Sequence, residues 1–87
     1  MIHDKRLRRK IQNRCRKLWN NEDNGLPDIG QIFKDDEFEA KFLGHKISFR
    51  NCEVSFEVTD LNANITYTVH FTEYIRGGPN YWYIKEK

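Results

Sequence analysis

The sequence predicts an α+β domain in which an N-terminal amphipathic basic helix packs on a four-stranded antiparallel β-meander. Two periodicities predict this fold class. Apolar residues recur every three or four positions within the first twenty residues, and every second position from residue 37 onward. The length suits a single domain over residues 1–87, with a basic helix at 1–20, an acidic connector at 21–36 and an antiparallel sheet at 37–87.

The helix is predicted from an apolar stripe that occupies about 80° of a helical wheel. Four residues form the stripe: Leu7, Ile11, Cys15 and Leu18. Asp4 precedes it and can accept hydrogen bonds from the N–H groups of the first turn. Residues 20–27 carry Asn, Gly and Pro in the order that commonly ends a helix. We therefore expect a helix over residues 3–20 that buries its stripe against the sheet.

The sheet is predicted from runs of alternating apolar residues. The first run covers residues 38–42, and the Leu43-Gly44-His45 sequence after it is typical of a tight turn. The inward parity changes between Phe49 and Cys52, so we place a β-bulge near residues 50–51 within one long second strand. The later elements are a hairpin loop at residues 60–64, a strand at 65–71, a turn at 77–80 and a strand at 81–85.

The segment between the helix and the sheet is expected to be a connector. Residues 28–37 contain three apolar anchors, Ile29, Ile32 and Phe33, and have room for one helical turn.

Charge is strongly segregated along the chain. Eight of the fifteen basic residues lie between Lys5 and Lys17, so residues 1–20 carry a net charge of +7 and residues 21–87 a net charge of −5. Such a basic helix indicates a polyanion or an acidic protein surface as the partner. We predict phosphate contacts with RNA or DNA from seven residues: Lys5, Arg6, Arg9, Lys10, Arg14, Arg16 and Lys17.

Two alternatives involve the acidic residues that follow the helix. Residues 22–39 carry a net charge of −6, and this segment can fold back to neutralise the basic helix. Alternatively, Asp35, Asp36 and Glu37 mimic nucleic acid and bind a basic groove on a nucleic-acid-processing host protein. The protein would then be a stoichiometric inhibitor or adaptor of the kind that phages and mobile elements encode. A basic helix that binds an acidic pocket on such a protein is a variant of the same hypothesis.

Aromatic residues are concentrated near the C-terminal turn. Tyr74, Tyr81, Trp82 and Tyr83 flank this Gly-rich turn, and in a strand Tyr81 and Tyr83 share the face opposite Trp82. At least one aromatic face should therefore lie near the surface, where Tyr81 or Trp82 can stack on a base. The alternative is that the helix and residues 28–36 cover both faces.

A catalytic site is not expected. Pro27-Asp28, followed by Glu39-Ala40-Lys41, resembles in outline the PD…(D/E)xK pattern of metal-dependent nucleases. This resemblance, which covers residues 27–41, implies two carboxylates that hold Mg²⁺ and a lysine that helps to activate water. That family needs a further helix after its sheet, for which the sequence leaves no room, and Asp28 precedes a connector instead of lying in a hairpin. We therefore predict a binding protein that is not an enzyme.

Other features exclude further classes of function. The three histidines and two cysteines lack metal-ligand spacing, and the sequence contains no Gly-rich phosphate loop, so we expect no metal, no cofactor and no small-molecule substrate. No run approaches the ~18 apolar residues of a membrane span, and no apolar segment follows the basic start as in a secretory signal. Cys15 and Cys52 lack a CxxC spacing, so we expect free thiols in a reducing, cytoplasmic location.

Overall fold

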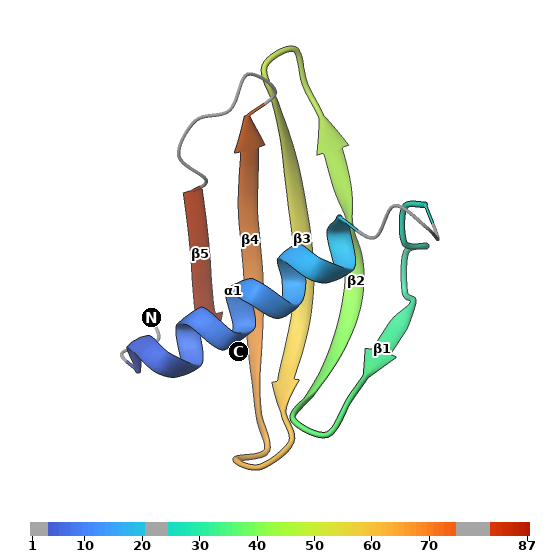
Figure 1. Ribbon diagram of the computed structural model, residues 1–87. Helices are drawn as coiled ribbons and strands as arrows, with labels where there is room; N and C mark the ends of the chain where they lie inside the picture. Colours follow the sequence, from blue (N-terminus) through green and yellow to red (C-terminus); the bar gives the residue numbers. More distant parts are fainter. Residues whose placement is uncertain (1–3, 21–24, 75–80) are drawn as a thin grey trace.

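The computed structural model describes residues 4–20, 25–74 and 81–87 and contains one helix and one antiparallel sheet (Figure 1). The five strands of the sheet follow the order β1-β2-β3-β4-β5, so each strand pairs with its neighbour in the chain. The α+β class is confirmed, but the expected count of four strands is wrong because β1 is an additional edge strand. The elements are α1 (Lys5–Trp19), β1 (Ile32–Lys34), β2 (Phe38–Ile47), β3 (Asn51–Asp60), β4 (Ile65–Tyr74) and β5 (Tyr81–Glu86).

The helix α1 begins where the sequence places its cap. Asp4 Oδ1 accepts hydrogen bonds from the backbone N–H groups of Arg6 at 3.0 Å and Leu7 at 3.1 Å. This satisfies two of the donors that a helix start leaves without intrahelical partners. The helix crosses one face of the sheet diagonally, with its N-terminal end beside β5 and its C-terminal end over β2 (Figure 1). One face of the sheet is therefore covered by α1, and we call the other the open face.

The connector expected at residues 28–37 contains a strand instead of a helical turn. In β1, Ile32 pairs with Lys41 and Lys34 pairs with Glu39. Asp35 Oδ1 accepts hydrogen bonds of 2.8 Å from the backbone N–H groups of Glu37 and Phe38, which closes the turn into β2. The turn aligns the backbone of residues 32–34 with β2. A strand of three residues is too short to produce a recognisable alternation in the sequence.

The predicted tight turn and β-bulge have exchanged places. The β2–β3 register shifts between Phe42 and Gly44, so β2 continues through residues 43–45 with Leu43 as the extra residue. Gly44 has a φ of +137°, which glycine adopts without the steric cost of a Cβ atom. The chain reverses later, where Ser48 N donates to Asn51 O at 2.8 Å. The turn expected at residues 77–80 lies outside the described residues.

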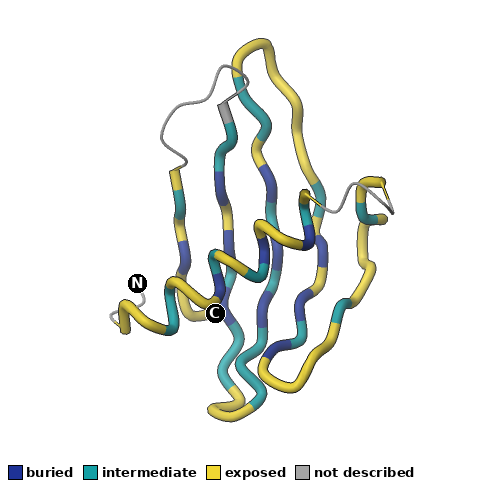
Figure 2. Tube along the Cα trace, viewed as in Figure 1, coloured by how far each residue is buried: buried dark blue, intermediate teal, exposed yellow. Residues whose placement is uncertain are grey.

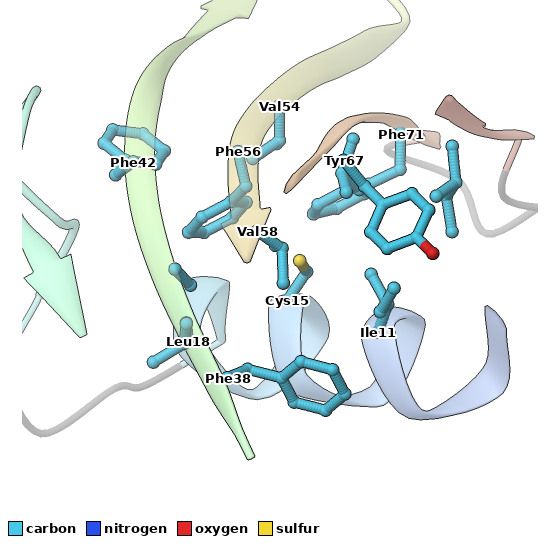
Figure 3. Packing of buried hydrophobic residues seen from close by; sticks show 13 residues of the cluster. Ile11, Cys15, Leu18, Phe38, Phe42, Val54, Phe56, Val58, Tyr67 and Phe71 are labelled. Atoms are coloured by element: carbon cyan, nitrogen blue, oxygen red, sulfur yellow. The ribbon is translucent and has the colours of Figure 1, made fainter. Parts of the chain in front are cut away.

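The core lies between α1 and the covered face of the sheet. Figure 3 shows the side chains of Ile11, Cys15 and Leu18 pointing from α1 toward the sheet. Burial alternates along the central strands, as Figure 2 shows for β3 and β4. The inward set predicted for β3 is confirmed, with Val54, Phe56 and Val58 fully buried and Cys52 half-buried. The other core residues from the sheet are Phe38, Ala40, Phe42, Tyr67, Val69, Phe71 and Ile84.

Aromatic contacts complete the core around the end of α1. The rings of Phe42 and Phe56 meet edge to face, with centroids 5.3 Å apart. Trp19 lies beside Phe42, and its indole Nε1 donates to Glu73 Oε2 at 2.9 Å, so its polar group is satisfied. Both cysteines are free, as predicted. Within the described part of the chain, α1 is neither long nor apolar enough to cross a bilayer.

Candidate functional site

Most cations of α1 lie on the half of the helix that faces away from the core. Because Ile11, Cys15 and Leu18 point at the sheet, the opposite arc of the helix is exposed. Five exposed cations lie within about 120° of arc around that direction. We call these residues the cationic ridge: Lys5, Arg6, Arg9, Arg16 and Lys17. They include five of the seven residues predicted to contact phosphate.

The other two predicted contact residues lie on the flank of α1 that faces the β1–β2 turn. Lys10 Nζ forms an ion pair with Glu37 Oε2 at 3.0 Å, and Arg14 Nε lies 3.3 Å from Asp35 Oδ2. About half of the Lys10 and Glu37 side chains is exposed, at 50% and 51%, so this pair is worth only about 0.2–1 kcal/mol. Within the described residues, the acidic segment therefore neutralises one flank of α1.

The acidic residues Asp35, Asp36 and Glu37 do not form one outward-facing surface. The carboxylate of Asp35 accepts the N–H groups of Phe38 and Glu37 and lies beside Arg14, and these contacts lower its pKa. Glu37 pairs with Lys10, while Asp36 is exposed at the turn. Two of the three carboxylates predicted as a nucleic-acid mimic are thus directed toward α1.

The opposite flank of α1 contacts β5. Arg8 Nη2 donates to the backbone carbonyl oxygen of Trp82 at 3.4 Å. Arg16 of the ridge remains exposed but extends toward this flank, with its guanidinium carbon 5.7 Å from the centroid of the Trp82 ring. Trp82 is half-buried on the covered face, where it stacks on Phe71 with ring centroids 4.4 Å apart. The structure brings Trp82 and the cations of α1 together, whereas Tyr81 lies on the open face.

A hollow of about 650 Å³ lies along the flank of α1 that faces the β1–β2 turn. Its charged lining residues are Lys10, Arg14, Arg16, Lys17, Asp35 and Glu37. Because the two carboxylates offset part of the positive charge, the field in this hollow favours anions less strongly than the ridge does.

The residues of the nuclease outline do not form a metal site. Glu39 and Lys41 lie in β2 opposite Thr59 and Glu57 of β3, and Asp28 is exposed before β1. Among residues 4–20, 25–74 and 81–87, no group of three or more His, Cys, Asp or Glu side chains is placed to hold a metal ion.

The open face of the sheet holds a second candidate site, which was not predicted from the sequence. Ser55, His70 and Tyr83 lie side by side on β3, β4 and β5, and a hollow of about 400 Å³ extends from them toward Tyr81. Ser55 Oγ and His70 Nδ1 share a hydrogen bond of 2.7 Å. Only the alternation within β5 was visible in the sequence. The pairing of β3, β4 and β5 was needed to place Ser55 and His70 beside the tyrosines.

Comparisons with protein-family models, with curated proteins and with solved structures found no match for this chain.

Proposed function

We propose that this protein binds nucleic acid through the cationic ridge of α1 and acts by occupying its target. The observation that carries the proposal is that α1 has an apolar face and a cationic face. The apolar stripe anchors the helix in the core, while Lys5, Arg9 and Arg16 extend along the exposed side. A surface helix needs only a solvated polar face, which uncharged residues or mixed charges would also supply. A face made largely of like charges indicates an anionic partner.

The spacing of the ridge residues suits a row of phosphates. With a rise of about 1.5 Å per residue, Lys5 and Arg9 lie about 6 Å apart along the helix axis, and Arg9 and Arg16 about 10 Å apart. Arg16 and Lys17 extend the row to the C-terminal turn. Three of the five ridge residues are arginines, whose planar guanidinium groups can donate two hydrogen bonds to one phosphate.

Phosphate binding relieves a repulsion that the folded protein retains. Like-charge pairs such as Lys5/Arg9 and Arg6/Arg9 cost about 0.2–0.5 kcal/mol each on an exposed helix. A polyanion removes this cost and releases its own condensed counterions. Engagement of about five phosphates predicts a slope of log Kd against log salt of about 4.5 for duplex DNA and about 3.5 for a single strand.

The direct test is a fluorescence anisotropy titration with single- and double-stranded RNA and DNA at about 50 and 200 mM salt. We expect submicromolar binding at the lower salt and a steep loss at the higher salt. The double reversal Arg9→Glu/Arg16→Glu should weaken binding by about 100-fold or more. The double reversal Lys34→Glu/Arg50→Glu changes net charge equally but places the new charges on β1 and in the β2–β3 turn, where both residues are exposed, and it should change the affinity by less than about three-fold.

A second pair of substitutions separates this proposal from the inhibitor hypothesis. Asp35→Asn/Glu37→Gln removes the carboxylates that face Arg14 and Lys10. If the helix binds phosphate, these two cations become available, so the affinity should rise and the salt slope should steepen by up to about two. If the acidic residues bind a basic groove on a nucleic-acid-processing protein, the same change should abolish binding to that protein. Absence of wild-type binding to every oligonucleotide at low salt would reject the phosphate-binding proposal.

A further inference from the structure

Three aromatic rings form a strip on the open face of the sheet, on the side opposite α1. Tyr81 and Tyr83 alternate with Trp82 along β5, and Tyr83 pairs with His70 of β4. The ring centroids of His70 and Tyr83 are 6.1 Å apart, with their planes inclined by 35°. Tyr81 is 67% exposed and Tyr83 is 37% exposed. We call Tyr81, Tyr83 and His70 the aromatic strip.

The aromatic strip is not required by the core. Phe71, Trp82 and Ile84 are the residues that β4 and β5 direct to the covered face, and the core is complete with them. The open-face neighbours of the strip include two small polar residues, Ser55 and Thr72, which leave the rings accessible, and Glu53 also lines the hollow. Exposed single tyrosines are common, but rings clustered around a hollow favour a binding role.

The backbone beneath the strip lies in paired strands, and the His70 ring is held by a hydrogen bond. His70 lies on β4, between β3 and β5, and its ring is fixed by the 2.7 Å hydrogen bond with Ser55 Oγ. The adjoining hollow of about 400 Å³ falls within the size range of small-molecule and nucleotide sites. Because a tyrosine side chain has only two rotatable dihedral angles and the backbone is already fixed in the sheet, the rings lose little conformational entropy when a planar ligand stacks on them.

The charges around the strip are balanced. Two open-face carboxylates of β3 lie opposite lysines of β2, in the pairs Glu53/Lys46 and Glu57/Lys41. Lys87 Nζ also contacts Glu57 Oε2 at 2.9 Å. A phosphate-linked chain can therefore approach the strip without strong repulsion. This neutral, aromatic surface suits a planar heteroaromatic ring better than a second cationic site would.

The aromatic strip and the cationic ridge are connected through β5. This strand forms the edge of the sheet, and Arg8 of α1 donates to its Trp82 carbonyl from the covered side. The N-terminal half of α1 therefore lies against one side of the strand whose tyrosines face the other side. A single strand can bend around such an edge, whereas duplex DNA, with a persistence length of about 50 nm, cannot.

We infer that the open face at β4 and β5 stacks the unpaired bases of a single-stranded nucleic acid whose phosphates contact the cationic ridge. The inference rests on the proposed function and adds the class of ligand, a single strand. Bases within a duplex are stacked on one another, so their faces are inaccessible to Tyr81 and Tyr83. Stacking on aromatic side chains tolerates any base, so we expect little sequence preference.

The test compares a single-stranded oligonucleotide, an abasic strand of the same length and a duplex, each by anisotropy at about 50 and 200 mM salt. Wild type should bind the single strand more tightly than the abasic strand. The variant Tyr81→Ala/Tyr83→Ala should lose about ten-fold or more in affinity for the single strand, with unchanged binding of the abasic strand and an unchanged salt slope. Tyr81→Phe/Tyr83→Phe keeps both rings and should retain most of the affinity.

The outcomes separate the inference from the function on which it rests. Equal wild-type affinity for the single and abasic strands, or an alanine variant that binds the single strand normally, would overturn stacking while phosphate binding by the ridge stands. Tighter binding of the duplex than of the single strand would overturn it as well. If wild type binds none of the three probes at low salt, the proposed function fails and the inference fails with it. A thermal melt of each variant confirms that the sheet is intact.

Discussion

The two faces of the sheet are built from alternate residues of the same strands but carry different constraints. On the covered face, Val54, Phe56 and Val58 are fully buried beneath α1. On the open face, the alternating positions hold Ser55, Glu57 and similar polar residues, none of which the core needs. Side chains on the covered face are therefore determined by packing, whereas an unusual group on the open face reflects another requirement. The aromatic strip is such a group.

Truncating one side chain on each face tests this asymmetry most directly. Phe56→Ala removes a ring that is 0% exposed and contacts Phe42, so it should lower the free energy of unfolding by about 3–5 kcal/mol. Thr68→Ala, on the open face of the adjacent strand, should lower it by less than about 1 kcal/mol. Urea denaturation followed by circular dichroism measures both.

A domain of this size has limited stability, and a loss of about 3–5 kcal/mol is comparable to all of it, so Phe56→Ala needs a milder companion. Phe56→Leu is therefore the companion variant, with a smaller loss of about 1–2 kcal/mol. Equal losses for Phe56→Leu and Thr68→Ala would show that the two faces contribute alike, which contradicts the asymmetry described above.

The two cysteines report how far α1 shields the covered face from solvent. Cys15 is fully buried under α1, and burial raises the pKa of its thiol to about 12. Cys52 is half-buried at the start of β3, and its pKa is also raised, by partial burial and by Glu73 and Glu53. Because the thiolate is the reactive form, a thiol reagent near pH 8 should modify Cys52 at least about 100-fold faster than Cys15.

Single-cysteine variants assign the two labelling rates. Cys52→Ser reports Cys15 alone, and Cys15→Val reports Cys52 alone. In denaturant the two rates should become similar, because neither thiol is then buried. Equal rates in the native protein would show that α1 does not seal the sheet beneath it.

The elements that the sequence predicted correctly are those with a long repeat. The stripe of α1 spans four apolar residues, and the pattern from Cys52 to Val58 spans four alternating positions, so each pattern has one structural solution. The bulge and the turn of β2 were exchanged because both change the parity of a strand, and only the pairing of Phe42 with Phe56 separates them. The three residues of β1 carry too little pattern to be recognised.

In the candidate site, too, features set by local pattern were predictable and features set by tertiary contacts were not. The arc of exposed cations follows from helical geometry, so the ridge was predictable from residues 5–17. The ion pairs of Lys10 and Arg14 depend on where the β1–β2 turn lies against α1, which no local pattern determines. The aromatic strip needed the register of three strands, since Ser55, His70 and Tyr83 are far apart in sequence and adjacent only after pairing.

A weaker contribution to stability comes from the acidic turn between β1 and β2, which contacts one flank of α1. Hydrogen bonds from the backbone N–H groups of Phe38 and Glu37, with a contribution from Arg14, hold the pKa of Asp35 below its usual value. At pH values between the folded-state and unfolded-state pKa, the unfolded chain therefore binds more protons at Asp35 than the folded protein does. The stabilisation is present above about pH 4, the usual Asp pKa, and is lost as the pH falls through the lower folded-state pKa.

Asp35→Asn tests this linkage by thermal melts between about pH 2 and pH 7. The stability difference from wild type should be less than about 1 kcal/mol at neutral pH, because the Asp35 side chain is 41% exposed, and it should shrink toward the acid end. Asp36→Asn makes the same change in net charge one residue further along, so it controls for the overall field. If the Asp35→Asn difference stays constant down to the acid limit, the charge of Asp35 does not hold the turn against α1. The loss would then come from backbone geometry that asparagine reproduces less well.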